Sequence, residues 1–309
     1  MFNLKHYILT KEIVFSDIVN DFLNYKYLQV KKSTFLKYKY LIEKYLYPEL
    51  KNLTIKELLN YDFNILINNY QNLDTTTIKL LTSILKSILK FAERKYDVDF
   101  KIDLIKCSSK IQEELQVFSN NEKQKLIAYC YNNYTLKTLG ILMSLYTGIR
   151  IGELCALKWK NIDLENDIIN ITETLQRVYV NNSTQILIDS PKSNSSIRKI
   201  PINKKLHDIL ISIKSKNSYE SENYFLTGLN DKFIEPRNYQ YTFKIILEKL
   251  NLPHYNFHIL RHTFATDCIN LNMDVKSLSK ILGHSNVSIT LNKYVHPSLE
   301  KIKIYLERI

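Results

Sequence analysis

The chain has 309 residues, which is enough for two domains of ordinary size. Its 43 Lys and Arg residues outnumber its 31 Asp and Glu residues, and the net charge of +12 indicates a polyanionic partner: DNA, RNA or an acidic membrane surface. The sequence contains no signal peptide or membrane span, and its four widely spaced cysteines favour a reducing cytoplasm over a disulfide framework or a zinc site: Cys107, Cys130, Cys155 and Cys268.

The first hundred residues predict a small helical bundle with a basic outer face, which we expect to form a domain at 1–100. Four helices are predicted: one capped by Ser16 and running to about Val30, one capped by Ser33 and stopped at Pro48, one after Thr54, and one after Asp74. The last is the clearest, because apolar residues recur at helical spacing from Ile78 to Ala92. A short polar stretch at 101–116 predicts a linker.

Residues 117–309 predict a second, mostly helical domain. Segments 118–133 and 135–148 predict a capped helix and a buried helix, and the helical pattern returns after Asn203. Between them, three short β-branched segments predict a single three-stranded antiparallel sheet: 168–172, 176–180 and 197–202. The expected fold class is therefore mainly α with a small antiparallel β-sheet.

Four segments of this second domain carry side chains suited to chemistry. They are TGIRIGELCALKW with Arg150 and Glu153, SPKSNSSIRKIPI with Lys192, HILRHTFAT with His258, Arg261 and His262, and LGHSNVSITLNKYVH with His284 and Tyr294. Singly, each has an ordinary explanation. An Arg–Glu pair three residues apart is usually a helix salt bridge, and a lone turn lysine is usually solvated. A histidine is more often satisfied by a local hydrogen bond than catalytic, and this tyrosine is one of 22.

Taken together, these residue types suit phosphodiester transfer without a metal ion. Two guanidinium groups can bind the nonbridging oxygens of a pentavalent phosphorus, and imidazole groups add hydrogen-bond donors. A lysine can protonate the leaving 5′ oxygen, and a phenol with an ordinary pKa of about 10 needs cationic neighbours to become a phenolate nucleophile. The sequence has no clustered acidic pairs, no HExxH motif and no glycine-rich phosphate loop, so we expect no metal and no cofactor.

In this order, the same segments resemble the tyrosine recombinase (phage integrase) family. The resemblance covers the catalytic domain from about Phe118 to the end, and STFLKYKYLIEKYLYPELKNLTIKEL resembles the family's helical core-binding (SAM-like) domain. The resemblance implies a mixed α/β catalytic domain whose site residues are Arg150, Lys192, His258, Arg261, His284 and the nucleophile Tyr294. It implies that Glu153 braces the pocket and that His262 supports the site or orients the phosphate rather than carrying a proton; Lys199 is an alternative to Lys192.

The resemblance also implies the partners. It implies a C-shaped clamp on double-stranded DNA recombination sites, a tetrameric synapse of copies of the chain, and an accessory directionality or DNA-bending factor; no membrane is involved. The basic residues expected to contact DNA are Lys31, Lys32, Lys37, Lys39, Lys44, Lys86 and Lys90, with a solvated basic face as the alternative. The tail HPSLEKIKIYLERI is amphipathic and is expected to dock on an adjacent protomer, or alternatively on its own domain.

The function that follows is a site-specific recombinase, the integrase of a mobile element, acting through a 3′-phosphotyrosyl intermediate. Three other functions stay open. They are a Xer-like resolvase or a DNA invertase, a regulator that binds DNA without cutting it, and a type IB topoisomerase with the same chemistry. Only about a dozen residues precede the first helix, so a separate arm-binding domain is not expected there.

Overall fold

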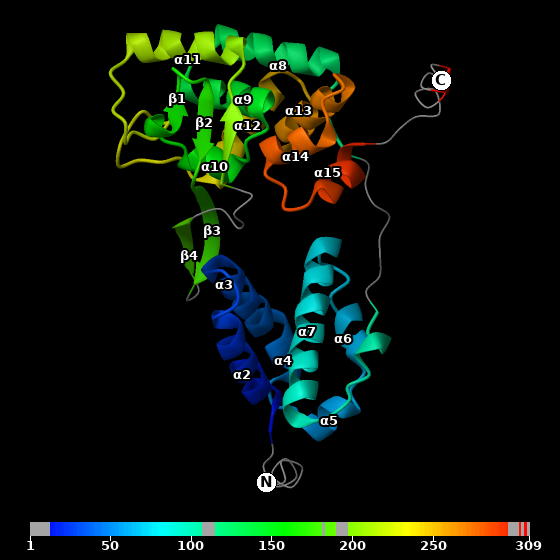
Figure 1. The fold of residues 1–309 in the computed structure, drawn as a ribbon. Coiled ribbons are helices and arrows are strands. Elements are labelled where there is room, and N and C mark those ends of the chain that lie inside the picture. The colour runs from blue at the N-terminus through cyan, green and yellow to red at the C-terminus, as the bar shows by residue number, and fades with distance from the viewer. Residues whose placement is uncertain are drawn as a thin grey trace. The chain divides into compact units, whose positions relative to one another are not determined.

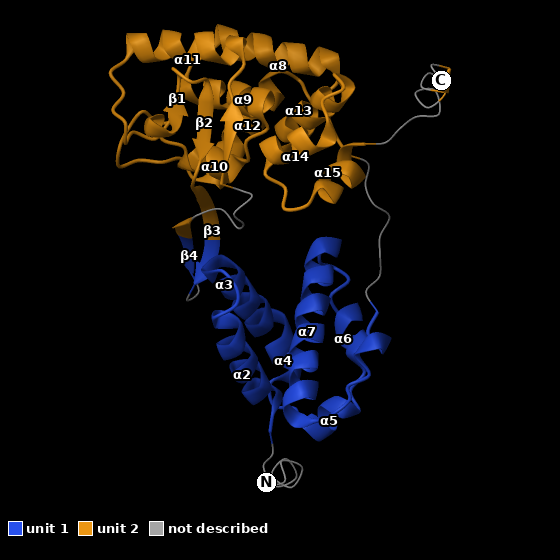
Figure 2. Cartoon of the chain, in the orientation of Figure 1, with its two compact units in different colours: residues 1–113, 178–185 blue, residues 114–177, 186–309 orange. Residues whose placement is uncertain are grey.

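The computed structural model describes residues 13–106, 115–180, 183–189 and 197–295, together with 303 and 306–307. Lys192, Cys107 and almost all of the predicted tail helix lie outside the described residues. The chain divides into two compact units (Figures 1 and 2). Unit 1 contains residues 1–113 and 178–185, and unit 2 contains residues 114–177 and 186–309.

Unit 1 is helical. Its elements are α2 (Phe15–Tyr27), α3 (Lys32–Leu41), the π-helical η1 (Ile42–Leu46), α4 (Tyr47–Leu50), α5 (Ile55–Leu59), α6 (Phe63–Asn68), α7 (Thr75–Tyr96) and the 3-10 turn η2 (Ile102–Leu104). The apolar stripe of α7 is buried, as its spacing predicts. Ile102 and Ile105, which the sequence prediction placed in a linker, pack in the same core.

Two of the predicted caps in unit 1 are confirmed. Thr54 accepts a hydrogen bond from the Glu57 backbone N–H, and Asp74 accepts one from Thr77. The helix α6, which Asp62 caps, was not predicted, so the unit has more short helices than the four expected.

The predicted boundaries of the first two helices are wrong. Helix α2 begins at Phe15 and ends at Tyr27. Ser16 does not cap it; the Asp17 carboxylate stabilises the first turn instead, by accepting a hydrogen bond from the Val14 N–H. Ser33 lies buried inside α3. Pro48 does not end the helical stretch. It lies in the first turn of α4, where a backbone N–H has no partner within the helix and its absence in proline costs nothing.

Unit 2 packs helices around a small sheet. Its helices are α8 (Asn120–Asn132), α9 (Leu136–Thr147), α10 (Ile151–Ala156), α11 (Lys204–Lys216), α12 (Pro236–Lys249), α13 (His258–Asn270), α14 (Val275–Leu282) and α15 (Val287–Tyr294), with the 3-10 turn η3 (Trp159–Asn161). Helix α9 is buried along almost its whole length and packs against α13. The core therefore fixes the helix that ends beside the candidate site.

The strands pair differently from the prediction. The three-stranded antiparallel sheet has the order β1 (Ile162–Asp163), β2 (Ile168–Ile171), β5 (Arg198–Pro201), whereas β3 (Thr174–Val180) and β4 (Ser183–Asp189) form a separate two-stranded sheet. The predicted strand at 176–180 is thus correct as a strand but wrong as a member of the first sheet. Its side chains after Leu175 are all at least partly exposed, so it has no buried face to pair against the core.

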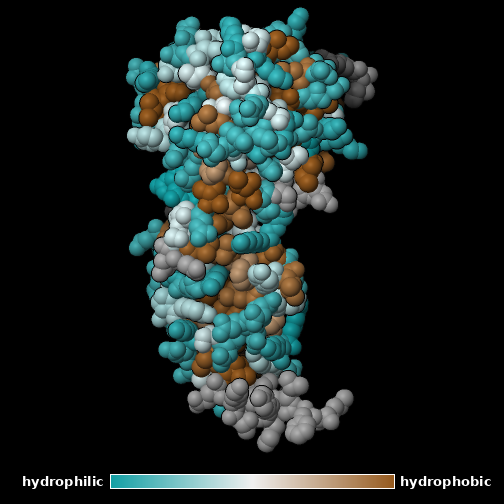
Figure 3. All heavy atoms as spheres, turned by 90° about the vertical axis from the view of Figure 1, so that its left-hand side faces the viewer, coloured by the Kyte–Doolittle hydropathy of each residue, from teal (hydrophilic) through white to brown (hydrophobic). Residues whose placement is uncertain are grey.

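One face of the molecule is largely polar. On the face drawn in Figure 3, hydrophilic side chains cover most of the area and apolar ones form smaller patches. Every helix in the part of the chain that the structure describes is too short or too polar to cross a bilayer.

Candidate active site

Two arginines of unit 2 are fixed by backbone carbonyls at two turns. Arg261, on α13, donates to the Gly148 carbonyl (2.8 Å) and to the Leu282 carbonyl (2.7 Å). Arg150, the residue before α10, donates to the Gly283 carbonyl (3.2 Å). Because Leu282 and Gly283 are consecutive, both guanidinium groups meet at one turn. Arg261 is only 2% exposed, whereas the Arg150 side chain is 31% exposed and open to solvent.

Both turns require glycine. Gly148 ends α9 with φ +66°, and Gly283 ends α14 with φ +64°, a left-handed conformation that side chains resist. A Cβ at Gly283 would lie 2.8 Å from Cδ of Arg198, and one at Gly148 would lie 2.6 Å from Cδ1 of Phe264. The two glycines therefore let the chain turn tightly enough to present carbonyl oxygens to the arginines.

A buried carboxylate joins Arg150 to a third arginine. Glu153, 3% exposed, accepts from Arg150 Nη1 (2.7 Å) and from the Arg150 backbone N–H (2.9 Å). Arg198 donates both of its Nη groups to the two Glu153 oxygens at 2.9 Å and its Nε to the Ile281 carbonyl. Burial raises the pKa of Glu153, but the hydrogen bonds and charge of Arg198, with the charge of Arg150, lower it to about 2.

Arg198 was not among the predicted site residues. Its signal was available in the sequence, because Arg198, Ile200 and Ile202 alternate on one face of the predicted strand 197–202 and are all buried. A buried arginine at such a position requires a partner, and Glu153 is the partner. Lys199, the alternative to Lys192, lies on the opposite, exposed face of β5. Lys192 itself lies outside the described residues.

His284 is held on both sides of its ring. Arg261 donates to Nε2 (3.0 Å), and Nδ1 lies 2.8 Å from the hydroxyl of the buried Thr290 on α15. A guanidinium can only donate, so Nε2 is unprotonated and the proton of the neutral ring sits on Nδ1. Burial, followed by the charges of Arg261 and Arg150, lowers the pKa of His284 to about 4.

Tyr294 ends α15 inside a small apolar cluster with Cys268, Leu278 and Leu282, and only 6% of it is exposed. Its hydroxyl lies 2.9 Å from Nδ1 of His262. Burial raises the pKa of Tyr294 above its ordinary value, although Arg261 and Arg150 act in the opposite direction. The cationic surroundings alone therefore do not make this phenol a phenolate.

The remaining histidine and an unpredicted lysine complete the site. His258 begins α13, its ring contacts that of His262 edge to face at 4.7 Å, and burial with the charge of His262 lowers its pKa to about 3. Lys293, beside Tyr294, is half-buried, and its pKa is lowered by burial and by Arg261. Burial and Arg150 lower the pKa of Arg261 to about 9, which leaves it protonated at neutral pH.

The structure brings together five of the six predicted catalytic residues, together with Glu153 and His262. Arg150 and Arg198 pair with Glu153, and Arg261 adds a third guanidinium group at the same turn, so the cluster carries an excess of positive charge even before Lys293 is counted. Such a centre attracts an anion with several oxygens and can bind it through planar N–H forks. Among the described residues, no group of His, Cys, Asp and Glu is arranged to hold a metal ion.

A sequence model of the phage integrase family matches residues 116–301, more than half of the chain. The chain belongs to the phage integrase family. The resemblance drawn from the motifs is thereby confirmed, and so is the expected mainly helical fold class.

Among the integrase relatives, the chain is 31% identical over 251 residues to a XerC-like tyrosine recombinase of Caldanaerobacter subterraneus subsp. tengcongensis. It is 28% identical over 258 residues to the transposase from transposon Tn916 of Enterococcus faecalis. These matches cover 73% and 78% of the chain but only 63% and 62% of the relatives. In structure, it is similar to the integrase of transposon Tn1549 in complex with circular intermediate DNA, with a TM-score of 0.76, 25% identity and coverage of 96% of this chain and 99% of that one.

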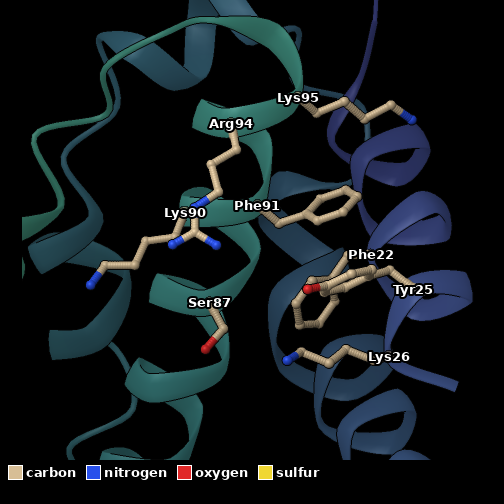
Figure 4. A pocket seen from close by; sticks show the side chains of 8 residues that line it. All are labelled: Phe22, Tyr25, Lys26, Ser87, Lys90, Phe91, Arg94 and Lys95. Carbon is tan, nitrogen blue, oxygen red and sulfur yellow. The ribbon is translucent and has the colours of Figure 1, made fainter. Parts of the chain in front are cut away.

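In unit 1 of this integrase-family chain, helix α7 carries a stripe of cations and small hydroxyl residues. The exposed or half-buried members of the stripe follow helical spacing: Lys79, Ser83, Lys86, Ser87, Lys90 and Arg94. They line two adjoining hollows of about 410 and 350 Å³. Figure 4 shows the larger hollow, in which Phe22, Tyr25 and Lys26 of α2 face Phe91 and the basic residues of α7.

The other predicted DNA-contacting lysines lie elsewhere in unit 1. Lys32, Lys37 and Lys39 belong to α3, Lys31 precedes it, and Lys44 is in η1. Lys39 pairs with Glu43 at 3.9 Å. Lys44 donates to the Tyr40 hydroxyl (2.9 Å) and lies over the rings of Tyr40 and Tyr45. Of the predicted set, Lys86 and Lys90 line the two hollows along α7.

Proposed function

We propose that the protein is a site-specific DNA recombinase that cleaves and rejoins DNA through a 3′-phosphotyrosyl intermediate, and that it serves the integration and excision of a mobile element. One observation carries the proposal: Arg150 and Arg261 converge at the turn 282–283 beside the buried hydroxyl of Tyr294. The similarity to a transposon transposase and to a transposon integrase in complex with DNA supports the mobile-element role.

In this mechanism the scissile phosphate binds between the two guanidinium groups. Arg150 and Arg261 neutralise the charge that grows on the nonbridging oxygens of the pentavalent phosphorus. Glu153 and Arg198 hold Arg150 in place, because the carboxylate is itself locked by two hydrogen bonds from Arg198. His258 supplies a further ring N–H group at the site, and His284, whose ring nitrogens meet Arg261 and Thr290, helps to hold Arg261 in place.

The transfer itself exchanges one ester for another. The Tyr294 oxygen forms a bond to phosphorus, and the bond from phosphorus to the 5′ oxygen breaks. The leaving 5′ oxygen takes a proton, for which Lys192 is the proposed acid. The phosphotyrosyl ester keeps the bond energy, so a second 5′ hydroxyl can reverse the reaction on the same or another strand.

Unit 1 is the proposed duplex-binding part. The stripe on α7 faces solvent with cations at regular spacing, and Ser83 and Ser87 leave room for a sugar–phosphate backbone to approach. Self-assembly into a tetramer, docking of the tail on a neighbouring protomer, an accessory DNA-bending factor and a cytoplasmic location stay predictions.

The test begins with mapping the target. Cleavage is mapped on the DNA that flanks the gene, and a nicked suicide duplex carrying the mapped site then traps the covalent protein–DNA adduct. The wild-type protein should form a 3′ adduct, and Tyr294→Phe should bind the duplex with unchanged affinity and form none. An adduct with Tyr294→Phe would refute the nucleophile.

The same assay separates the alternatives. Binding without any adduct would identify a non-cutting regulator. Relaxation of supercoiled DNA without exchange between paired sites would identify a topoisomerase. The products from directly and inversely repeated sites distinguish integration and excision from resolution or inversion.

A further inference from the structure

We infer that His262 is the catalytic base for Tyr294, taking the phenolic proton as the phenolic oxygen attacks phosphorus. This inference rests on the proposed function, and it gives His262 a direct part in the reaction instead of the supporting one expected from sequence.

The geometry selects His262 among the three histidines of the site. Nδ1 of His262 lies 2.9 Å from the Tyr294 hydroxyl, and the two ring centroids are 5.8 Å apart at 52°. Both ring nitrogens of His284 are already engaged, by Arg261 and by Thr290. Its ring lies parallel to that of Tyr294 at 6.5 Å between centroids. His258 contacts the ring of His262 and stands one helical turn away from it on α13.

The protonation states agree with this assignment. Burial, then Lys293 and Arg261, lowers the pKa of His262 to about 4, so its imidazole is uncharged at neutral pH. A neutral ring can accept at Nδ1 while Nε2 keeps the proton, and the phenol of Tyr294, whose pKa is raised, donates. Before DNA binds, Tyr294 is therefore a protonated phenol that is hydrogen-bonded to His262, a weak base.

Binding of DNA strengthens the base. The groups that face His262 are His258 and Arg261 on its own helix and Lys293 and Tyr294 on α15, so its charged neighbours are both cationic. A phosphodiester anion held by the arginines offsets this positive charge, and the pKa of His262 then rises towards neutral pH, where a general base works best. The scissile phosphate thus activates His262, the base that deprotonates the nucleophile Tyr294.

The proton balance is complete. The phenolic proton moves to Nδ1 of His262 while the bond from oxygen to phosphorus forms, and the leaving 5′ oxygen receives a different proton from the proposed acid Lys192. In rejoining, the 5′ hydroxyl returns its proton to the lysine and His262 returns its own to the phenolic oxygen. No oxidant, reductant or further reactant is needed.

The decisive variant is His262→Asn, because an amide oxygen can accept the hydrogen bond near the position of Nδ1 but cannot hold the proton. The matched control is His254→Asn, an exposed histidine outside the site. Single-turnover adduct formation on the mapped suicide duplex is measured from pH 6 to 9. At pH 7 we expect His262→Asn to be slower by roughly 100-fold with unchanged duplex affinity, and His254→Asn to match the wild type.

The pH profiles distinguish a base from a positioning residue. The wild-type rate should rise with pH and level off above the raised pKa of His262 in the DNA complex, whereas the rate of His262→Asn should rise about tenfold per pH unit over the whole range as solvent takes the proton. A rate within about threefold of the wild type, or an equal deficit at every pH, would overturn the assignment.

A second substrate separates the acid from the base. When sulfur replaces the bridging 5′ oxygen, the leaving group departs without a proton. The rate of adduct formation by Lys192→Ala should then recover, and the rate of His262→Asn should stay low. Recovery of the rate of His262→Asn would show that His262 is the acid, and it would refute the inference. If the wild-type protein forms no adduct on any mapped duplex, the proposed function fails first, and the inference fails with it.

The hydrogen bond can be tested without DNA. In ¹⁵N spectra of the imidazole rings, His262 should carry its proton on Nε2 and show a hydrogen-bonded Nδ1 whose signal moves in Tyr294→Phe. A proton on Nδ1 of His262 would overturn the inference whatever the kinetics show.

Discussion

Replacing Arg198 by methionine would test the buried centre that holds Arg150. The substitution keeps a long side chain in β5 but removes the two hydrogen bonds and the charge that Glu153 receives. Glu153 would then be a buried carboxylate with Arg150 as its remaining arginine partner.

The expected magnitude follows from the pKa of Glu153. A fall from the ordinary value of 4.5 to about 2 corresponds to about 3 kcal/mol of folding stability. Because the folded-state pKa is lowered, this stability is fully present above pH 4.5 and is lost as the pH falls towards 2. Removing one partner of a buried pair costs about 3–5 kcal/mol, so both routes give a similar loss for Arg198→Met at pH 7.

Urea denaturation followed by the fluorescence of Trp159 measures this loss in unit 2, because Trp159 is the single tryptophan of the chain. The matched control is Lys199→Met, the exposed neighbour of Arg198 in the same strand, which should change the free energy of unfolding by less than about 0.5 kcal/mol. The double variant with Glu153→Gln should be less destabilised than the sum of the two single variants. A loss below about 1 kcal/mol, or strictly additive effects, would refute the reasoning.

Three further predictions concern the same protein. Gly283→Ala should lower the free energy of unfolding by about 1–2 kcal/mol and slow cleavage, because its φ is +64° and the new Cβ would meet Arg198; an unchanged midpoint and rate would contradict this. The three histidines of the site have folded-state pKa values of about 3–4, below the ordinary 6.5, so protons bind first to the unfolded chain and stability should fall as the pH drops from 6.5 to 5. The fall should be up to about 1 kcal/mol per pH unit for each histidine, and less where solvent screens the ring. His258→Asn should make the profile of stability against pH, followed by Trp159 fluorescence, less steep. A flat wild-type profile would disprove the account. Lys90→Ala should weaken binding to any duplex and reduce the slope of log affinity against log salt by about 0.9, whereas Lys39→Ala, whose lysine pairs with Glu43, should change the slope less; equal slopes would remove the α7 stripe from the interface.

The sequence by itself determined the features that depend on near neighbours in the chain. The caps at Thr54 and Asp74 and the apolar stripe of α7 are correct because a helix is specified within a few residues. The spacing of His258, Arg261 and His262 put three site residues on one helix, and the motifs around them identified the family.

The tertiary structure decided what depends on residues far apart. Strand 176–180 left the sheet it was assigned to, because pairing is chosen by which face can be buried and not by strand propensity. Arg198 joined the site because it meets Glu153, 45 positions away, and the hydroxyl of Tyr294 meets His262, 32 positions away, as well as the charge of Arg261. Local patterns specify which side chains share a helix, but two glycine turns and the packing of α13, α14 and α15 determine which charges meet. Burial in that packing, together with those charges, shifts the pKa values of the histidines, of Arg261 and of Tyr294.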